Sequence, residues 1–156
     1  MRFRKKWIRE LAVWGAIAAA VYFGNVQVQT WLGHRALAAT GLEVHDLTEG
    51  LELARVESKP VLAGLSAIWC SSCRKFDGEV LSDPAVRRRI RDDFVFVRVE
   101  YESDEGEAFR ARHGLKGFPN LVLLDGQGEL IRRLPTTYDP RRFEALLRQP
   151  VDPSGR

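Results

Sequence analysis

Two cysteines, Cys70 and Cys73, stand three positions apart, and the chain holds no others. A thiol pair at this spacing can exchange with other disulfides, form a structural disulfide or bind a soft ion such as Cu(I). Zinc and iron–sulfur sites normally need about four Cys or His ligands in paired clusters. The chain offers only three scattered histidines for such a set: His34, His45 and His113. We therefore expect no metal and no cofactor beyond a redox-active disulfide. Copper carriage stays an alternative, without a Met-rich or His-rich segment to support it.

A purely structural disulfide between these cysteines would be a weak cross-link, because a loop of two intervening residues constrains little of the unfolded chain. Their position favours chemistry instead. Cys70 falls at a predicted junction of strand and helix, where the helix N-terminal amides and the helix dipole stabilise a thiolate. Cys73, one helical turn on, can then attack the mixed disulfide that Cys70 forms and release the substrate. Trp69 either shields the pair or packs in the core beside it.

The elements around the pair follow an α/β order. The apolar run Val61–Ser66 ends just before the cysteines and is typical of a central strand covered on both faces. A helix from Cys70 to about Val80 should follow, and the β-branched and aromatic run Phe94–Val99 indicates a second strand. The order predicts a central mixed sheet flanked by helices. The other expected elements are a helix from Asp46 or Thr48 to about Ser58, helices after Pro84, over 104–113 and after Pro140, and strands over 121–124 and 129–134.

The N-terminus has the composition of a signal anchor. Basic residues over 2–9 precede the apolar run Leu11–Phe23, and no charge appears from Leu11 to Gly33. As a helix, this uncharged stretch would extend about 34 Å, enough to cross a hydrocarbon core of about 30 Å. Trp7 and Trp31 stand where interface aromatics are expected, and the basic excess places the N-terminus in the cytoplasm. The alternatives are a cleaved signal peptide, with small residues at 18–20, and a buried helix of a cytosolic protein.

The chain is expected to divide into four segments. A basic tip and signal-anchor helix occupy 1–33, a juxtamembrane linker 34–40, one α/β domain 41–150 and a flexible tail 151–156. The domain would lie on the periplasmic or other extracytoplasmic side of the inner (cytoplasmic) membrane, held by a single span.

Charge argues against a nucleic-acid partner. From Gly41 onward the chain carries 18 basic and 20 acidic residues, so its body is slightly acidic. The one basic run, Arg87–Arg91, is flanked closely by Asp83, Asp92 and Asp93. It is typical of a solvated helix face rather than of a phosphate-binding site.

Several motifs together resemble the thioredoxin superfamily. CxxC alone is a weak signal, whereas CxxC after an apolar strand, with a later Gly-x-Pro before another strand, is specific. Within the superfamily, the sequence is most similar to the C-terminal periplasmic domain of the DsbD family of transmembrane disulfide reductases, over roughly Leu42–Gln149. The residues that carry this resemblance are Pro60-Val61-Leu62, Trp69-Cys70, Cys73, Phe76, Ser82-Asp83-Pro84, Gly117-Phe118-Pro119 and Asp125-Gly126-Gln127-Gly128.

The resemblance implies a thioredoxin-like fold and a substrate groove. It implies a cis peptide bond before Pro119, which brings the backbone of Phe118 beside Cys70 and offers an edge to an extended substrate segment; Phe118 would then touch the active sulfur. One departure concerns the buried Asp that the family carries six residues before the first cysteine, because Gly64 stands there. Asp77, four residues after the second cysteine, matches an acidic position of the DsbD domain. It is either a partial substitute in proton transfer or a plain surface acid.

These observations predict a membrane-anchored, extracytoplasmic thiol–disulfide oxidoreductase. The DsbD resemblance implies that it reduces disulfides in protein substrates. With one candidate span, the chain would need a separate membrane or thioredoxin-like electron donor to restore its thiols. The alternative is a non-catalytic thioredoxin-like binding module on a membrane stalk, with the cysteines permanently paired.

Overall fold

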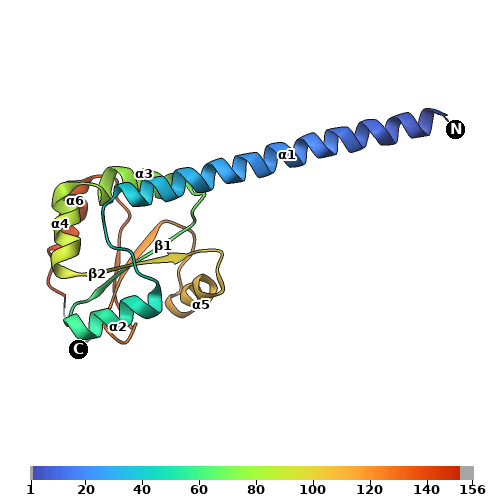
Figure 1. Ribbon diagram of the computed structural model, residues 1–156. Coiled ribbons are helices and arrows are strands. Elements are labelled where there is room, and N and C mark those ends of the chain that lie inside the picture. The colour runs from blue at the N-terminus through green and yellow to red at the C-terminus, as the bar shows by residue number, and fades with distance from the viewer. Residues whose placement is uncertain (1, 152–156) are drawn as a thin grey trace.

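The computed structural model describes residues 2–151, with side chains described for Trp7 and from Arg9 onward. The part of the predicted tail beyond Val151 lies outside the described residues. Figure 1 shows a compact domain from which one long helix extends. The elements are α1 (Arg2–Ala39), α2 (Leu47–Glu57), β1 (Val61–Ser66), α3 (Ser71–Phe76), the π-helical turn η1 (Asp77–Leu81), α4 (Pro84–Asp93), β2 (Val95–Glu100), α5 (Asp104–His113), β3 (Asn120–Leu124), β4 (Leu130–Leu134) and α6 (Pro140–Leu147).

The sheet has the strand order β2-β1-β3-β4. Strand β1 pairs in parallel with β2 and antiparallel with β3, and β3 pairs antiparallel with β4. All six residues of β1 are buried, as its continuous apolar sequence predicts for a strand covered on both faces. The mixed sheet flanked by helices is therefore confirmed.

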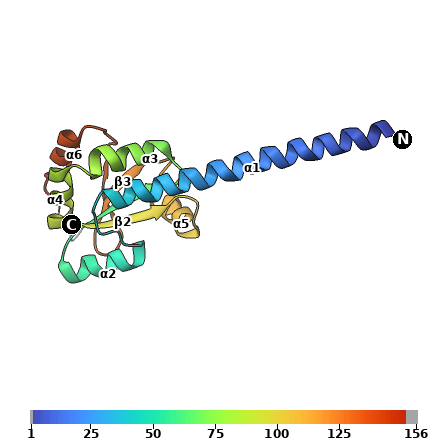
Figure 2. The same ribbon diagram turned by 45° about the horizontal axis from the view of Figure 1, so that its top comes forward.

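Two apolar clusters fill the spaces on either side of the sheet. One joins Leu62, Phe96 and Leu123 to the inner faces of α3, η1, α4 and α6, with Phe143 fully buried at its centre. The other joins alternate residues of the same strands to α2 and α5, for example Val97 to Phe109. This alternation follows from the period of two in a strand. The result is three layers, with α2 and α5 on the face opposite α3, α4 and α6 (Figures 1 and 2).

Local signals in the sequence set several helix ends. The Asp46 carboxylate accepts from the backbone N–H of Glu49 and caps α2, and Asp83 caps α4 ahead of Pro84. Gly114 ends α5 in the left-handed conformation at φ 59°. The helix predicted from Cys70 to Val80 differs in its second half, because after Phe76 the chain winds as the π-helical turn η1.

The first helix departs from the expected anchor and linker. Helix α1 continues without a break through Ala39, so residues 34–39 are helical rather than an extended connector. Its last turns pack on the domain: Leu37 joins the cluster around Phe143, and the backbone of Gly33 approaches that of Ile68. A Cβ at Gly33 would lie 2.0 Å from the carbonyl oxygen of Ile68, so any side chain there would push the two apart.

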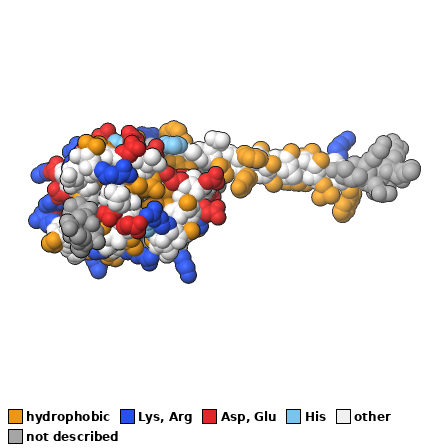
Figure 3. Space-filling view, turned by 90° about the horizontal axis from the view of Figure 1, so that it is seen from below, with side chains coloured by type: hydrophobic (Ala, Val, Ile, Leu, Met, Phe, Trp, Pro, Cys, Tyr) orange, Lys and Arg blue, Asp and Glu red, His pale blue; other side chains and the backbone are white. Residues whose placement is uncertain are grey.

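The N-terminal part of α1 stands clear of the domain in both ribbon views (Figures 1 and 2). Residues Arg9–Ala39 are long and apolar enough to cross a membrane, by length and composition. In Figure 3 the projecting helix carries hydrophobic side chains, whereas charged side chains of both signs cover the face of the domain in view. An exposed apolar surface of this kind needs a covering environment, and a bilayer provides one.

Candidate active site

The two cysteines lie where the sequence predicts, at the junction between β1 and α3. They form a disulfide with the Cα atoms 5.2 Å apart, and both side chains are buried. Cys70 is the N-cap of α3, and its Sγ accepts from the backbone N–H of Cys73 at 3.0 Å. The Oγ of Ser72 also lies 3.0 Å from this Sγ. In the reduced protein, the same donors would stabilise a Cys70 thiolate, because hydrogen bonds to a charged form favour it.

An aromatic group covers the cysteine pair. Phe118 and Tyr101 pack against the cysteines, with their ring centroids 4.7 Å apart. Trp69 meets Phe118 edge-to-face at 5.4 Å and donates its indole N–H to Glu102 at 3.0 Å. With 40% of its surface exposed, Trp69 is not a core residue and forms the rim of the site. The Phe118–Pro119 peptide bond is cis, as the resemblance implies.

Asp77 lies on the inner side of the pair, in η1, and is not a surface acid. Its buried carboxylate accepts from the Arg98 guanidinium at 2.5 Å. Burial raises the pKa of Asp77 above its ordinary value, and Arg98 opposes part of that rise. Gly64 pairs with Arg98 across the β1–β2 register. A Cβ on Gly64 would meet its neighbours at ordinary contact distance, 3.8 Å, so packing does not require glycine there.

The end of β2 and the two residues that follow it belong to the site, although no sequence pattern pointed to them. Arg98 pairs with Asp77, Tyr101 packs on the cysteines and Glu102 holds the Trp69 indole. The Glu100 carboxylate accepts from the backbone N–H of Ile68 at 3.3 Å. Burial raises its pKa above the ordinary value, and the neighbouring Glu102 raises it further. The parallel pairing of β1 and β2 could have indicated these residues in advance, because it brings the carboxyl ends of both strands to one edge of the sheet.

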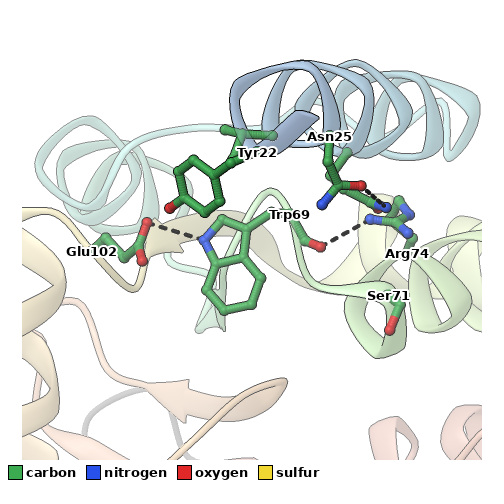
Figure 4. A pocket seen from close by; sticks show the side chains of 8 residues that line it. Tyr22, Asn25, Trp69, Ser71, Arg74 and Glu102 are labelled. Carbon is green, nitrogen blue, oxygen red and sulfur yellow. Dashed lines mark hydrogen bonds between the residues drawn. The ribbon is translucent and has the colours of Figure 1, made fainter. Parts of the chain in front are cut away.

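Helix α1 forms one wall of a groove beside the active-site loop. Figure 4 shows Tyr22 and Asn25 of α1 facing Trp69, with Arg74 and Ser71 on α3. Arg74 donates to the main-chain oxygen of Trp69 at 3.0 Å, which ties α3 to the loop. The groove has a volume of about 520 Å³ and is lined by Tyr22, Asn25, Val26, Gln29, Trp69, Ser71, Arg74 and Glu102.

Metal ligation finds no support in the described part of the chain. Across these residues, no three or more His, Cys, Asp or Glu side chains gather in an arrangement that could hold a metal ion.

Comparison with known proteins gives a consistent result. A family model described as a thioredoxin-like domain matches residues 47–150. The thiol:disulfide interchange protein DsbD of Escherichia coli strain K12 is 27% identical over 158 residues, covering 95% of this chain and 28% of the relative. DsbD of Shigella flexneri gives the same identity and coverage. The chain thus spans about 28% of the length of these curated relatives.

Solved structures share the fold. A thioredoxin from Thermus thermophilus has a TM-score of 0.63 and 29% identity, covering 69% of this chain and 85% of that one. The reduced C-terminal domain of Neisseria meningitidis DsbD has a TM-score of 0.58 and 23% identity, covering 69% and 98%. The chain therefore belongs to the thioredoxin-like domain family and is similar to DsbD.

Proposed function

We propose that this chain is a membrane-anchored thiol–disulfide oxidoreductase that reduces disulfides of protein substrates on the extracytoplasmic side. The observation that carries the proposal is the N-cap position of Cys70, whose sulfur already accepts a backbone N–H from the cysteine that would resolve its mixed disulfide. Membership of the thioredoxin-like family supports the reaction class, and the DsbD resemblance supports its direction.

The reaction runs in two exchanges. The Cys70 thiolate attacks a substrate disulfide, so that a mixed disulfide forms and one substrate thiol leaves. Cys73 then attacks Cys70 Sγ, the Cys70–Cys73 bond forms and the second substrate thiol leaves. The substrate gains two electrons and the pair is oxidised. A separate dithiol donor must restore it. Trp69, Phe118 and Pro119 would shape the groove that receives the substrate, and Asp77 would support proton transfer.

The anchor places this chemistry close to the membrane. We retain as a proposal a basic cytoplasmic tip, one span and an extracytoplasmic domain, with residues 34–39 forming the last turns of α1 in place of a separate linker. Because Tyr22 and Asn25 line the same groove as Trp69, the part of α1 clear of this groove ends at Val21. From Trp7 to Val21 it would extend about 22 Å as a helix, less than a hydrocarbon core of about 30 Å, so the groove would lie against the membrane surface. The CxxC edge of the domain would then face the membrane surface.

A disulfide reductase assay tests the function. We expect the full chain in detergent micelles, with dithiothreitol as donor, to reduce a peptide disulfide well above the rate of dithiothreitol alone. We also expect the oxidised chain to oxidise a dithiol peptide poorly. Rapid peptide oxidation with slow reduction would contradict the proposed direction. No exchange in either direction would favour a non-catalytic binding module.

A further inference from the structure

A small cavity lies behind Cys73, on the side away from the aromatic group. Four elements surround it: the end of α1, the loop after β1, the α3–η1 helix and the end of β2. The volume open to the centre of a water molecule is about 20 Å³, enough for about one water. Its walls are Gly33, Leu37, Ser66, Ala67, Ile68, Cys73, Arg74, Asp77, Arg98 and Glu100.

Helix α1 forms one side of this cavity. Gly33 and Leu37 line it there, and the tight approach of Gly33 to Ile68 fixes how closely the helix can lie. Leu37 is partly buried against the core cluster of the domain. The last turns of the anchor helix therefore contribute to the surroundings of Cys73.

Two carboxylates reach the cavity, and their partners differ. Asp77 accepts from the Arg98 guanidinium at 2.5 Å, so protonation of the Asp77 carboxylate would break a buried ion pair. The Glu100 carboxylate accepts from the Ile68 N–H at the longer distance of 3.3 Å, and a backbone N–H of Glu102 also favours its charged form. Protonation of Glu100 therefore costs less, and it is the carboxylate better placed to accept a proton.

We propose that Glu100 accepts the proton of the Cys73 thiol across this cavity, replacing the strand acid that Gly64 lacks. The inference rests on the proposed function and concerns its second exchange. As Cys73 loses its proton to Glu100, the Cys73 thiolate attacks Cys70 Sγ. The bond from Cys70 to the substrate sulfur breaks, and the departing substrate thiolate takes a proton from solvent. Glu100 would act as a general base that reaches Cys73 across the cavity, through one water.

Charged groups facing Glu100 come from three directions. Arg98 lies on the same strand, Asp77 approaches from η1 and Arg74 from α3. Glu102, just beyond the strand, adds negative charge. Among its described lining residues α1 contributes Gly33 and Leu37, neither of them charged. Burial and the Glu102 charge raise the pKa of Glu100 toward the working range of a thiol, where a base transfers protons most effectively.

The test separates the two exchanges. The reduced full chain in micelles is mixed with a symmetric peptide disulfide, and released peptide is counted by mass spectrometry after acid quench and alkylation. The first peptide reports attack by Cys70 and the second reports attack by Cys73. For Glu100→Gln we expect an unchanged first release and a second release slowed at least about tenfold at neutral pH, within the range of general-base effects. The rate of this slowed second release should rise about tenfold for each unit of increasing pH, because hydroxide then removes the proton from Cys73.

Two further variants make the outcome unambiguous. Glu107→Gln removes the same charge from an exposed position on α5 and should behave as the wild type. Cys73→Ser should give the first peptide and no second one. If Glu100→Gln matches Glu107→Gln in the second release and its pH profile, the inference is overturned while the proposed function stands. If the wild type releases no peptide at all, the proposed function falls as well.

Discussion

Cys70→Ser is expected to reduce peptide disulfide turnover to the rate of dithiothreitol alone. The serine hydroxyl is not ionised near neutral pH, so no sulfur nucleophile remains at the N-cap of α3 that could begin the exchange. Cys73, buried behind the loop at 2% exposure, is too enclosed to take over the first attack. The measurement is steady-state turnover by the full chain in micelles.

Cys73→Ser is expected to stop the reaction after the first exchange. Cys70 still attacks, but no second cysteine resolves the mixed disulfide, so a covalent adduct accumulates when the reduced variant is mixed with the peptide disulfide in the absence of dithiothreitol. Mass spectrometry of the intact chain should find one peptide per chain, attached at Cys70. The assigned roles are wrong if Cys70→Ser traps the peptide and Cys73→Ser does not, or if either variant keeps wild-type turnover.

Arg98→Met is expected to lower the free energy of unfolding by about 3 kcal/mol at neutral pH. The Arg98 and Asp77 side chains keep only 14% and 6% of their exposure, so losing the cation leaves a carboxylate uncompensated in the interior. Urea unfolding of the full chain in micelles measures the change. Arg112→Met is the matched control, because it breaks an exposed ion pair with Glu129 and should cost much less.

The decrease in the free energy of unfolding caused by Arg98→Met should depend on pH. Burial raises the folded pKa of Asp77 above its unfolded value, so the stability linked to this group is present at low pH and lost as pH rises through the folded pKa. Without Arg98 the folded pKa rises further, and the loss extends to higher pH. The difference in free energy of unfolding between variant and wild type should therefore widen as pH rises through the wild-type folded pKa of Asp77. A gap that stays constant would mean that Asp77 is not the group left unpaired.

The sequence predicted most of the scaffold because its signals are local. The run Val61–Ser66 is buried on both faces, and Asp46 and Gly114 end their helices as capping chemistry requires. The position of Cys70 at a strand-to-helix junction followed from the same signals. These features depend on residues within a few positions of one another.

The features that the sequence did not reveal depend on distant contacts. Glu100 was left outside the strand predicted over Phe94–Val99, and its place behind Cys73 requires the pairing of β2 with β1. Helix α1 is apolar without a periodic face, so nothing in its pattern distinguished the turns that dock from those that project. The contact of Gly33 with Ile68 joins residues 35 positions apart. Asp77 could not be assigned as buried until Arg98 was found opposite it.

The most direct test of the account is the reduction potential of the Cys70–Cys73 pair in the full chain, equilibrated against glutathione or dithiothreitol and read by thiol trapping. The account predicts reversible two-electron titration with a potential near or below about −220 mV, among reductants such as thioredoxin. A potential near about −120 mV, that of a strong oxidant, would contradict the proposed direction. A pair that dithiothreitol never reduces would contradict the account itself and leave the disulfide a structural one.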